Sequence, residues 1–234
     1  IDEQRDEFGI GGGSCFTKDV GIELEMFAQS AFLLAFVAKK LREREPLARI
    51  IVVDDGLEDG IANLDLVMGI APFVFSRNVN IGIMAAGRDD VVVLGDDGLL
   101  QTPGGFSLLA SEAEAHPEYG IISATMNNVG NRNQWPQGIG LRDEPRVVCF
   151  VAVYIPRRTI DLIGLMDQRF TAYGFDDDDY CLRIRNAGLK VGIHDGCFVD
   201  HNSLTSTFRG NPKAPANLTD GLKIFVDKWG SHPL

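Results

Sequence analysis

Four consecutive aspartates, residues 176–179, open an apolar, helix-like pattern in the segment RFTAYGFDDDDYCLRIRNAG. Aspartate is favoured in the first turn of a helix, where unpaired backbone N–H groups and the helix dipole stabilise a negative charge. Each such contact contributes only about 0.3–1 kcal/mol at an exposed site, and adjacent carboxylates repel one another. One or two aspartates would satisfy a helix cap, so the run of four indicates a chemical role besides the structural one.

Two other acidic pairs each follow a short apolar segment that is typical of a buried strand. Asp54 and Asp55 end the segment IIVVDD, and Asp96 and Asp97 follow VVVLG. Aspartate and glycine also favour turns, so each pair taken alone has a purely structural explanation. In α/β sheets, however, ligands bind beyond the carboxyl ends of the strands. We therefore expect these carboxylates to converge on one rim of a sheet, where they can bind a metal ion or the hydroxyl groups of a nucleotide.

Histidine is the remaining candidate metal ligand. The segment HDGCFVDHNS contains His194 and His201, beyond the aspartate run. A single histidine near a strand end is usually a surface or hydrogen-bonded residue. Its position after the strand-end acidic pair and the aspartate run makes His201 a candidate ligand. The four cysteines are widely spaced and form no CxxC pair, so the sequence does not indicate a zinc site.

The composition limits the classes of function. The net charge of −11 argues against nucleic-acid binding, because phosphate backbones are bound by lysine and arginine. A phosphorylated small molecule would need a divalent cation between it and the carboxylates, and oxygen-rich sites suit Mg²⁺ or Mn²⁺. The longest apolar tract, AFLLAFVA, is far shorter than the ~20 residues that span a bilayer. With no signal peptide evident, the expected location is the cytoplasm.

Helical and strand patterns alternate along the chain. Helices are predicted over 22–41 and 106–116 and from the aspartate run to Gly188, and strands over 48–55, 91–94, 119–125 and 146–156. This alternation predicts an α/β sheet that is largely parallel in its first half. Segment 126–146 is long and rich in Gly, Asn and Pro, and a loop of that length in a compact domain is more often functional than idle.

The ordered set of motifs resembles the family-2 glycosyltransferases, which have the GT-A fold and use nucleotide sugars. IIVVDDGLEDG is similar to the family's VVDDGSTDG, and NVNIGIMAAGRDDVVVLGDDG to its N-x-G-x-x-x-A segment and Asp-x-Asp strand end. Three further segments match family patterns: VCFVAVYIPRRTIDLIGLMDQRF, the aspartate run with the helix after it, and KIFVDKWG. The resemblance implies one GT-A-like domain over 1–234: a Rossmann-like nucleotide-sugar-binding half (about 1–97) with a mixed, mostly parallel sheet, an acceptor and catalytic half (98–209), and a C-terminal segment (210–234).

The resemblance also implies roles for individual residues. Asp177 would be the catalytic base and Asp176 would stand in the place of its neighbouring glutamate. Asp97 and His201 would bind the metal ion. The nucleotide-sugar donor, carrying UDP, GDP or dTDP, would contact four residues: Asp54, Asp55, Asn80 and Asp96. Trp229 would belong to a closing C-terminal segment near acceptor or donor.

The sequence departs from the family pattern in several places. Gly95 stands where the family often has Asp or Asn. The family's apolar first strand has no clear counterpart, and Ser14, Cys15 and Phe16 are the candidates for contacts with the donor base. The aspartate run also permits a shift of one residue, which leaves Asp176 and Asp178 as rival bases.

The expected activity is metal-dependent transfer of a sugar to the hydroxyl of a glycan or another acceptor, with inversion, and the expected sugar is a hexose. Asp179 would then be the structural member of the run or an acceptor contact. Two alternatives remain open. A nucleotidyltransferase on a similar scaffold would attack a phosphate and release pyrophosphate. A metal-stabilised carbohydrate-binding module would use the polar loop and catalyse nothing.

Overall fold

The computed structural model describes residues 21–25, 31–54, 64–71, 73–171, 174–204 and 214–231. Asp55 and the suggested donor-base contacts Ser14, Cys15 and Phe16 lie outside these ranges, and Asp54 is described by its backbone alone. No helix in the described ranges is long and apolar enough to cross a membrane.

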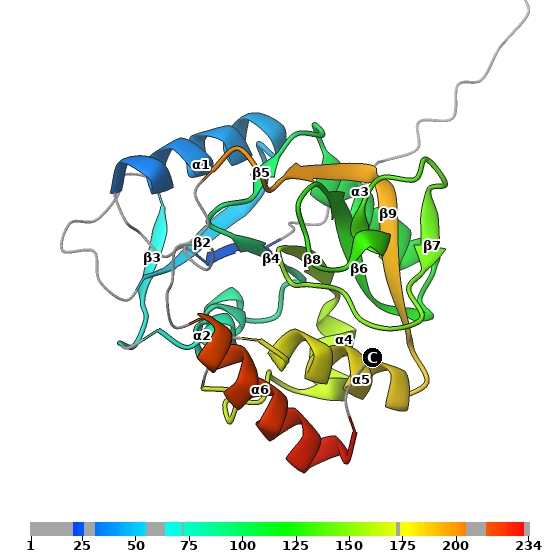
Figure 1. Ribbon diagram of the computed structural model, residues 1–234. Helices are drawn as coiled ribbons and strands as arrows, with labels where there is room; N and C mark the ends of the chain where they lie inside the picture. Colours follow the sequence, from blue (N-terminus) through cyan, green and yellow to red (C-terminus); the bar gives the residue numbers. More distant parts are fainter. Residues whose placement is uncertain are drawn as a thin grey trace, which may run out of the picture.

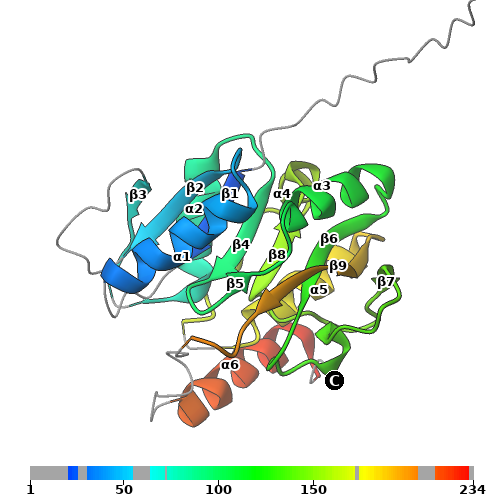
Figure 2. The same ribbon diagram turned by 90° about the horizontal axis from the view of Figure 1, so that it is seen from above.

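One mixed sheet carries helices on both faces (Figures 1 and 2). Over the described residues it has nine strands in the order β3-β2-β1-β4-β8-β6-β9-β5, with β7 paired to β9. The strands are β1 (Gly21–Glu25), β2 (Arg49–Asp54), β3 (Asp65–Met68), β4 (Val91–Gly95), β5 (Leu99–Leu100), β6 (Tyr119–Met126), β7 (Leu141–Asp143), β8 (Ala152–Ile155) and β9 (Lys190–Asp200). The helices are α1 (Ala31–Arg44), α2 (Phe75–Ala86), α3 (Gly105–Ala115), α4 (Arg157–Ile163), α5 (Asp176–Asn186) and α6 (Ala214–Trp229), with a 3-10 turn, η1 (Arg132–Gln134).

The first half of the sheet is parallel, as the sequence predicts. Strands β3, β2, β1 and β4 run in one direction, and the register pairs Val53 with Glu25 and Glu25 with Gly95. The carboxyl ends of β2 and β4 therefore meet one edge of the sheet, with only β1 between them. Strands are about 4.8 Å apart, so the backbones of Asp54 and Asp96 begin their loops roughly 10 Å from each other.

The second half of the sheet is mixed. Strand β8 is antiparallel to both β4 and β6, whereas β9 is parallel to β6. Strand β5, which follows the loop after β4, is antiparallel to the end of β9 and pairs Leu99 with Asp200. This pairing joins the acidic loop after β4 to the end of β9, where His201 follows.

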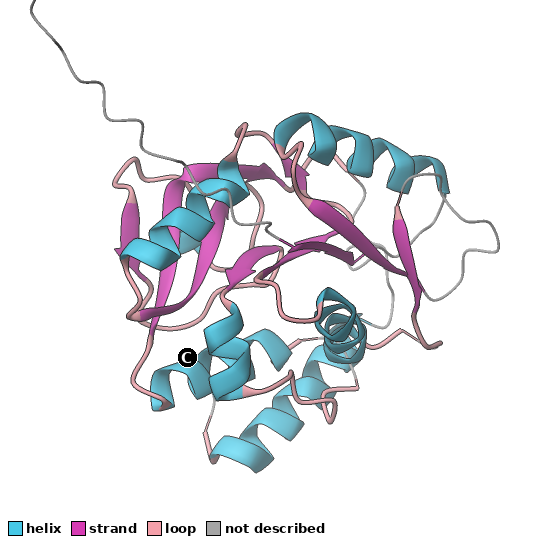
Figure 3. Ribbon diagram, turned by 180° about the vertical axis from the view of Figure 1, so that it is seen from behind, coloured by secondary structure: helices cyan, strands magenta, loops and turns pink. Residues whose placement is uncertain are grey.

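Two hydrophobic clusters cover the two faces of the sheet. Side chains alternate along a strand, so Ile50 and Val52 of β2 pack with helices α1 and α3, while Ile51 packs on the opposite face. That opposite face is covered by α2, α4 and α5, and α6 lies beyond them on the same side (Figure 3).

Two predicted elements are wrong in extent. The helix predicted over 22–41 begins only at Ala31, because 21–25 form the strand β1, which is paired on both sides. This strand is the first strand of the sheet, which the sequence pattern did not reveal. The strand predicted over 146–156 is limited to β8, because the backbone N–H groups of Val148 and Cys149 contact side chains of Cys181 and Gln134 instead of a neighbouring strand.

Candidate functional site

A carboxylate and an imidazole meet at the edge of the sheet where β4 and β9 end. Asp97 lies in the turn after β4, which the hydrogen bond from Gly98 N to Gly95 O closes at 2.9 Å. His201 directly follows β9. Its Nε2 lies 3.1 Å from Oδ1 of Asp97, and the two side chains are 14% and 11% exposed. The two side chains that the metal assignment pairs therefore lie within contact distance of each other.

The imidazole of His201 is oriented by the polar loop. Its Nδ1 lies 2.9 Å from the carbonyl oxygen of Asn128, and its backbone N–H donates to Oδ1 of Asn127 at 2.7 Å. A carbonyl oxygen can only accept, so we assign the ring proton to Nδ1. Nε2 then faces Asp97, where it can donate to the carboxylate when protonated or offer its lone pair to a cation when it is not. An imidazole held in this way by its second nitrogen is typical of metal-ligating histidines.

Asn128 has a left-handed backbone, with φ of 53°. Only asparagine, aspartate and glycine adopt this conformation readily, and such residues concentrate at functional sites. Here the left-handed residue is the one whose carbonyl oxygen contacts the ring of His201. Part of the polar loop 126–146 therefore orients His201.

The donor set fits a hard divalent cation. A carboxylate oxygen and a neutral imidazole nitrogen are both ligands that Mn²⁺ accepts, and Mg²⁺ favours the oxygen. Within the described ranges, no group of three or more His, Cys, Asp or Glu side chains could hold a metal ion. A cation at this pair would therefore have only two of these side chains as ligands there, which suits an ion shared with a phosphorylated ligand and water.

The predicted donor contacts lie in different environments. Asp96 is 7% exposed beside Asp97 in the turn after β4. Asn80 lies in α2 with 1% exposure, and both ends of its amide bind Met166: Nδ2 donates to the Met166 carbonyl at 2.9 Å, and Oδ1 accepts from the Met166 N–H at 2.8 Å. This geometry gives Asn80 a positioning role for the segment before α5. Its contact with a donor stays a prediction.

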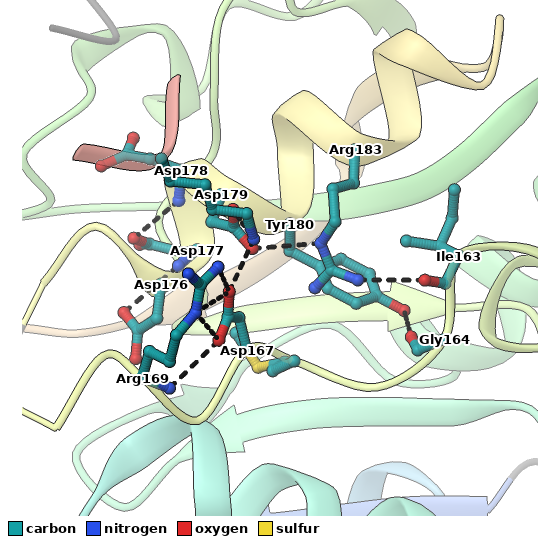
Figure 4. A network of polar contacts seen from close by, with 12 residues as sticks. Ile163, Gly164, Asp167, Arg169, Asp176, Asp177, Asp178, Asp179, Tyr180 and Arg183 are labelled. Atoms are coloured by element: carbon teal, nitrogen blue, oxygen red, sulfur yellow. Dashed lines mark hydrogen bonds and ion pairs between the residues drawn. The ribbon is translucent and has the colours of Figure 1, made fainter. Parts of the chain in front are cut away.

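The aspartate run opens helix α5, as predicted, and its four members have different surroundings (Figure 4). Phe175, just before the helix, has a left-handed backbone with φ of 70°. Asp176 is buried, and its Oδ2 has no hydrogen-bond partner among the residues that the structure describes. Asp177 and Asp178 are partly exposed. Asp179 is fully buried and fully engaged, since it contacts Arg183 at 3.0 Å and accepts from Trp229 Nε1 at 2.9 Å. The structural member of the run is therefore Asp179.

The first three aspartates repel one another. Burial raises the pKa of Asp176 well above its ordinary range, with the charge of Asp177 as the second cause. Burial and then the charge of Asp177 raise the pKa of Asp178 to about 8. Burial also raises the pKa of Asp177, but hydrogen bonds from the backbone of Asp178 and Phe150 oppose the rise. Backbone hydrogen bonds thus support a charge on Asp177, as they do on Asp176, and the charge of Asp177 raises the pKa of both of its neighbours.

A short buried segment connects the two clusters. The backbone of Phe150 contacts the carboxylate of Asp177, and the carbonyl of Val151, the next residue, accepts from Gly95 N at 2.8 Å. Gln134 of the polar loop holds the same segment, since its amide exchanges hydrogen bonds with both backbone groups of Cys149. The aspartate run and the Asp97–His201 pair are therefore neighbours built on one shared backbone segment.

Replacing Asp176 by Asn is expected to stabilise the fold at neutral pH. The buried carboxylate has a raised pKa, so the folded state loses stability as pH rises from the ordinary aspartate range towards the folded pKa. Each unit of pKa difference corresponds to about 1.4 kcal/mol, and 1 kcal/mol to about 2–4 °C in a chain of this size. Thermal unfolding at pH 8 and at pH 4 measures the effect. An increase in midpoint at pH 8 that does not shrink at pH 4 contradicts this explanation.

Replacing Asp179 by Asn, three residues further on, is expected to have the opposite sign. Asp179 is fully buried and balances the charges of Arg183 and Lys228, whose Nζ lies 2.6 Å from Oδ1. Breaking a buried ion pair by removing one partner typically costs about 3–5 kcal/mol. Urea unfolding of the two variants under the same conditions compares them directly. Equal shifts in the free energy of unfolding for Asp176→Asn and Asp179→Asn would show that the two buried carboxylates do not differ in their contribution to stability.

Several contributors to the site were not predicted individually. Asn127, Asn128 and Gln134 were recognised only as part of a polar loop, and their composition was the single available signal. Lys228 was covered only by the family-like segment KIFVDKWG, and its partners are distant in the sequence. The structure brings it to 2.7 Å from Asp167.

Comparison with known proteins supports the fold. No family model matches the chain, and neither does any curated protein. Among solved structures, the chain is similar to the crystal structure of GalNAc-T7 with UDP, GalNAc and Mn²⁺, with a TM-score of 0.68 and 11% sequence identity. The match covers 90% of this chain and 49% of that protein, so the chain spans about half its length.

The fold is GT-A-like. This agrees with the fold class that the sequence predicts. An identity of 11% establishes the fold alone, and the same fold can host different functions. Membership of family 2, the activity and the site residues are matters for proposal.

Proposed function

We propose that the protein is a metal-dependent glycosyltransferase of family-2 type. It transfers a hexose from a nucleoside-diphosphate sugar to an acceptor hydroxyl, with inversion. The observation that carries the proposal is the pair Asp97 and His201, 3.1 Å apart at the sheet edge where β4 ends. The GT-A-like fold and the aspartate helix next to this pair are consistent with it. An acidic protein needs a cation to hold an anionic donor, and this pair is suited to hold one.

The donor would lie along the edge where β2, β1 and β4 end. The backbone positions of Asp54 and Asp96 suit contacts with the nucleoside, and Asp55 follows directly in the sequence. Asn80 would contact the donor or act on it indirectly by holding Met166. Asp97 and His201 would hold Mn²⁺ or Mg²⁺. The cation, when bound, neutralises the diphosphate as it leaves, which typically supplies several kcal/mol.

Asp177 would accept the proton of the acceptor hydroxyl. In a single displacement, the acceptor oxygen forms a bond to the anomeric carbon while the bond from that carbon to the phosphate oxygen breaks. The proton moves to the Asp177 carboxylate, and the electron pair leaves with the nucleoside diphosphate. A base in a partly buried carboxylate cluster has a raised pKa, which brings it closer to neutral pH and so favours proton transfer. Asp176, buried next to it, would restrain the start of α5.

The experiment is product analysis with a panel of UDP, GDP and dTDP sugars in the presence of Mn²⁺. The proposal predicts release of nucleoside diphosphate that depends on donor, metal and an added saccharide acceptor. Release of pyrophosphate would instead identify a nucleotidyltransferase. If no donor is consumed and no nucleotide sugar raises the unfolding midpoint with Mn²⁺, the protein is not a glycosyltransferase.

A further inference from the structure

Helix α6 is attached to the start of α5 and to the segment before it. Lys228 Nζ lies 2.6 Å from Oδ1 of Asp179 and 2.7 Å from Oδ2 of Asp167. This one ammonium group therefore connects α6, α5 and the segment before α5. Trp229 Nε1 donates to the same oxygen of Asp179 at 2.9 Å. Asp179 lies two residues after Asp177, on the same helical turn, so these contacts act within one turn of the proposed base.

The same helix packs on the turn that precedes α5. Phe225 is 1% exposed, and its ring centroid lies 5.9 Å from that of Phe175, whose backbone is left-handed. Gly221 is so close that a Cβ atom there would lie 2.5 Å from the carbonyl oxygen of Gly174. A left-handed non-glycine residue persists only when its surroundings hold it. Here α6 provides part of those surroundings.

Both carboxylates that Lys228 contacts have a second, arginine partner. Asp179 pairs with Arg183 at 3.0 Å, and Asp167 pairs with Arg169 at 2.6 Å (Figure 4). Neither carboxylate would be left unpaired without Lys228. Arg183 and Arg169 are thus sufficient to balance the charges of the two carboxylates. The distinct contribution of Lys228 is that it connects α6 to α5 and to the segment before α5.

We propose that α6 positions the base of the reaction: Lys228 and Trp229, acting through Asp179 and Asp167, fix the start of α5 and hence the carboxylate of Asp177. This inference rests on the proposed function. Lys228 and Trp229 are positioning residues, since neither is required to touch donor or acceptor. A displacement of the base by about 1 Å can lower a rate about 100-fold, so a small loss of anchoring has a large kinetic effect.

The test compares Lys228→Met with Lys223→Met, an exposed lysine on the same helix that gives the same change in charge. The expected result for Lys228→Met is a kcat lowered about 10–100-fold, with the donor KM within about twofold of wild type. Lys228→Arg should recover most of the loss, because a guanidinium can also bridge two carboxylates. Equal kcat values for Lys228→Met and Lys223→Met would overturn the proposal, and so would a donor KM that rises as much as kcat falls.

A structural measurement separates this inference from the proposed function. Hydrogen exchange of the backbone amides of residues 176–180 should accelerate in Lys228→Met and in Gly221→Ala, while strands β4 and β6 stay protected. Gly221→Ala is an independent variant because it acts by contact with Gly174 and changes no charge. Unchanged exchange in both variants would overturn the positioning role even if transfer activity is found. Accelerated exchange in a protein without any transfer activity would retain the mechanical link and reject the proposed function.

Discussion

Replacing Asp177 by Asn is expected to lower the rate of sugar transfer by about 10²–10⁴-fold, the usual contribution of a positioned general base. The amide cannot accept the proton of the acceptor hydroxyl. Asn has nearly the same shape, and its Oδ1 can still accept the backbone N–H of Asp178, which donates at 3.0 Å in the native chain. Metal-dependent binding of the donor should therefore stay within about twofold of wild type. Single-turnover kinetics and calorimetric titration with UDP and Mn²⁺ measure the two quantities.

The matched control is Asp178→Asn, which removes the neighbouring carboxylate. Its loss should be smaller than that of Asp177→Asn, and the acid limb of the pH profile should change little, because Asp178, whose pKa is about 8 beside a charged Asp177, is protonated while the base ionises. In the wild type, the acid limb of the pH profile should lie at a higher pH than the ordinary pKa range of aspartate. The base must be ionised to act, and burial raises the pKa of Asp177, so activity falls as pH decreases through that raised pKa. Wild-type turnover in Asp177→Asn, or a larger loss in Asp178→Asn, would reassign the base.

Replacing His201 by Gln or Asp97 by Asn is expected to lower metal-dependent donor affinity by more than about 100-fold, since a metal contributes several kcal/mol to diphosphate stabilisation. Their contact of 3.1 Å makes them a unit. Losses from the two variants should therefore not add in the double variant. Calorimetric titration of UDP with and without Mn²⁺ measures the affinity.

His194→Gln is the control for this pair. His194 lies in strand β9, which His201 directly follows, but its Nδ1 accepts from Gly196 N at 2.9 Å and its Nε2 faces Glu112. Donor affinity in this variant should depend on Mn²⁺ as in the wild type. If His194→Gln and His201→Gln lose affinity equally, the effect comes from strand β9 as a whole and the metal assignment is wrong.

Much of the fold follows from local patterns in the sequence. Buried parallel strands are near-continuous apolar runs, and β2 and β4 were recognised for that reason together with the acidic residues at their ends. The same criterion failed at β1, where GIELE alternates apolar and charged residues and merges with the helical pattern after it. It also failed at 147–151, where a buried apolar segment is held by side chains instead of strand pairing.

The site was predictable where its residues carry a chemical signature at an element boundary. Asp97 and His201 fulfil this condition, since Asp97 lies in the turn after β4 and His201 directly follows β9, and the pairing of β5 with β9 brings these two strand ends together. Asn128 does not, because its role depends on a single left-handed residue and a backbone carbonyl. Lys228 does not either, since its two partners are defined only by tertiary packing. Sequence patterns identify ligands more readily than the groups that orient them.

The most direct test of the account is electron spin-echo spectroscopy of Mn²⁺ bound to the protein with UDP. If Asp97 and His201 hold the cation together, the spectrum will contain modulation from a directly coordinated ¹⁴N nucleus. That modulation will disappear in His201→Gln and persist in His194→Gln. A tightly bound Mn²⁺ without nitrogen modulation in the wild type, or with modulation that survives in His201→Gln, would contradict the central claim.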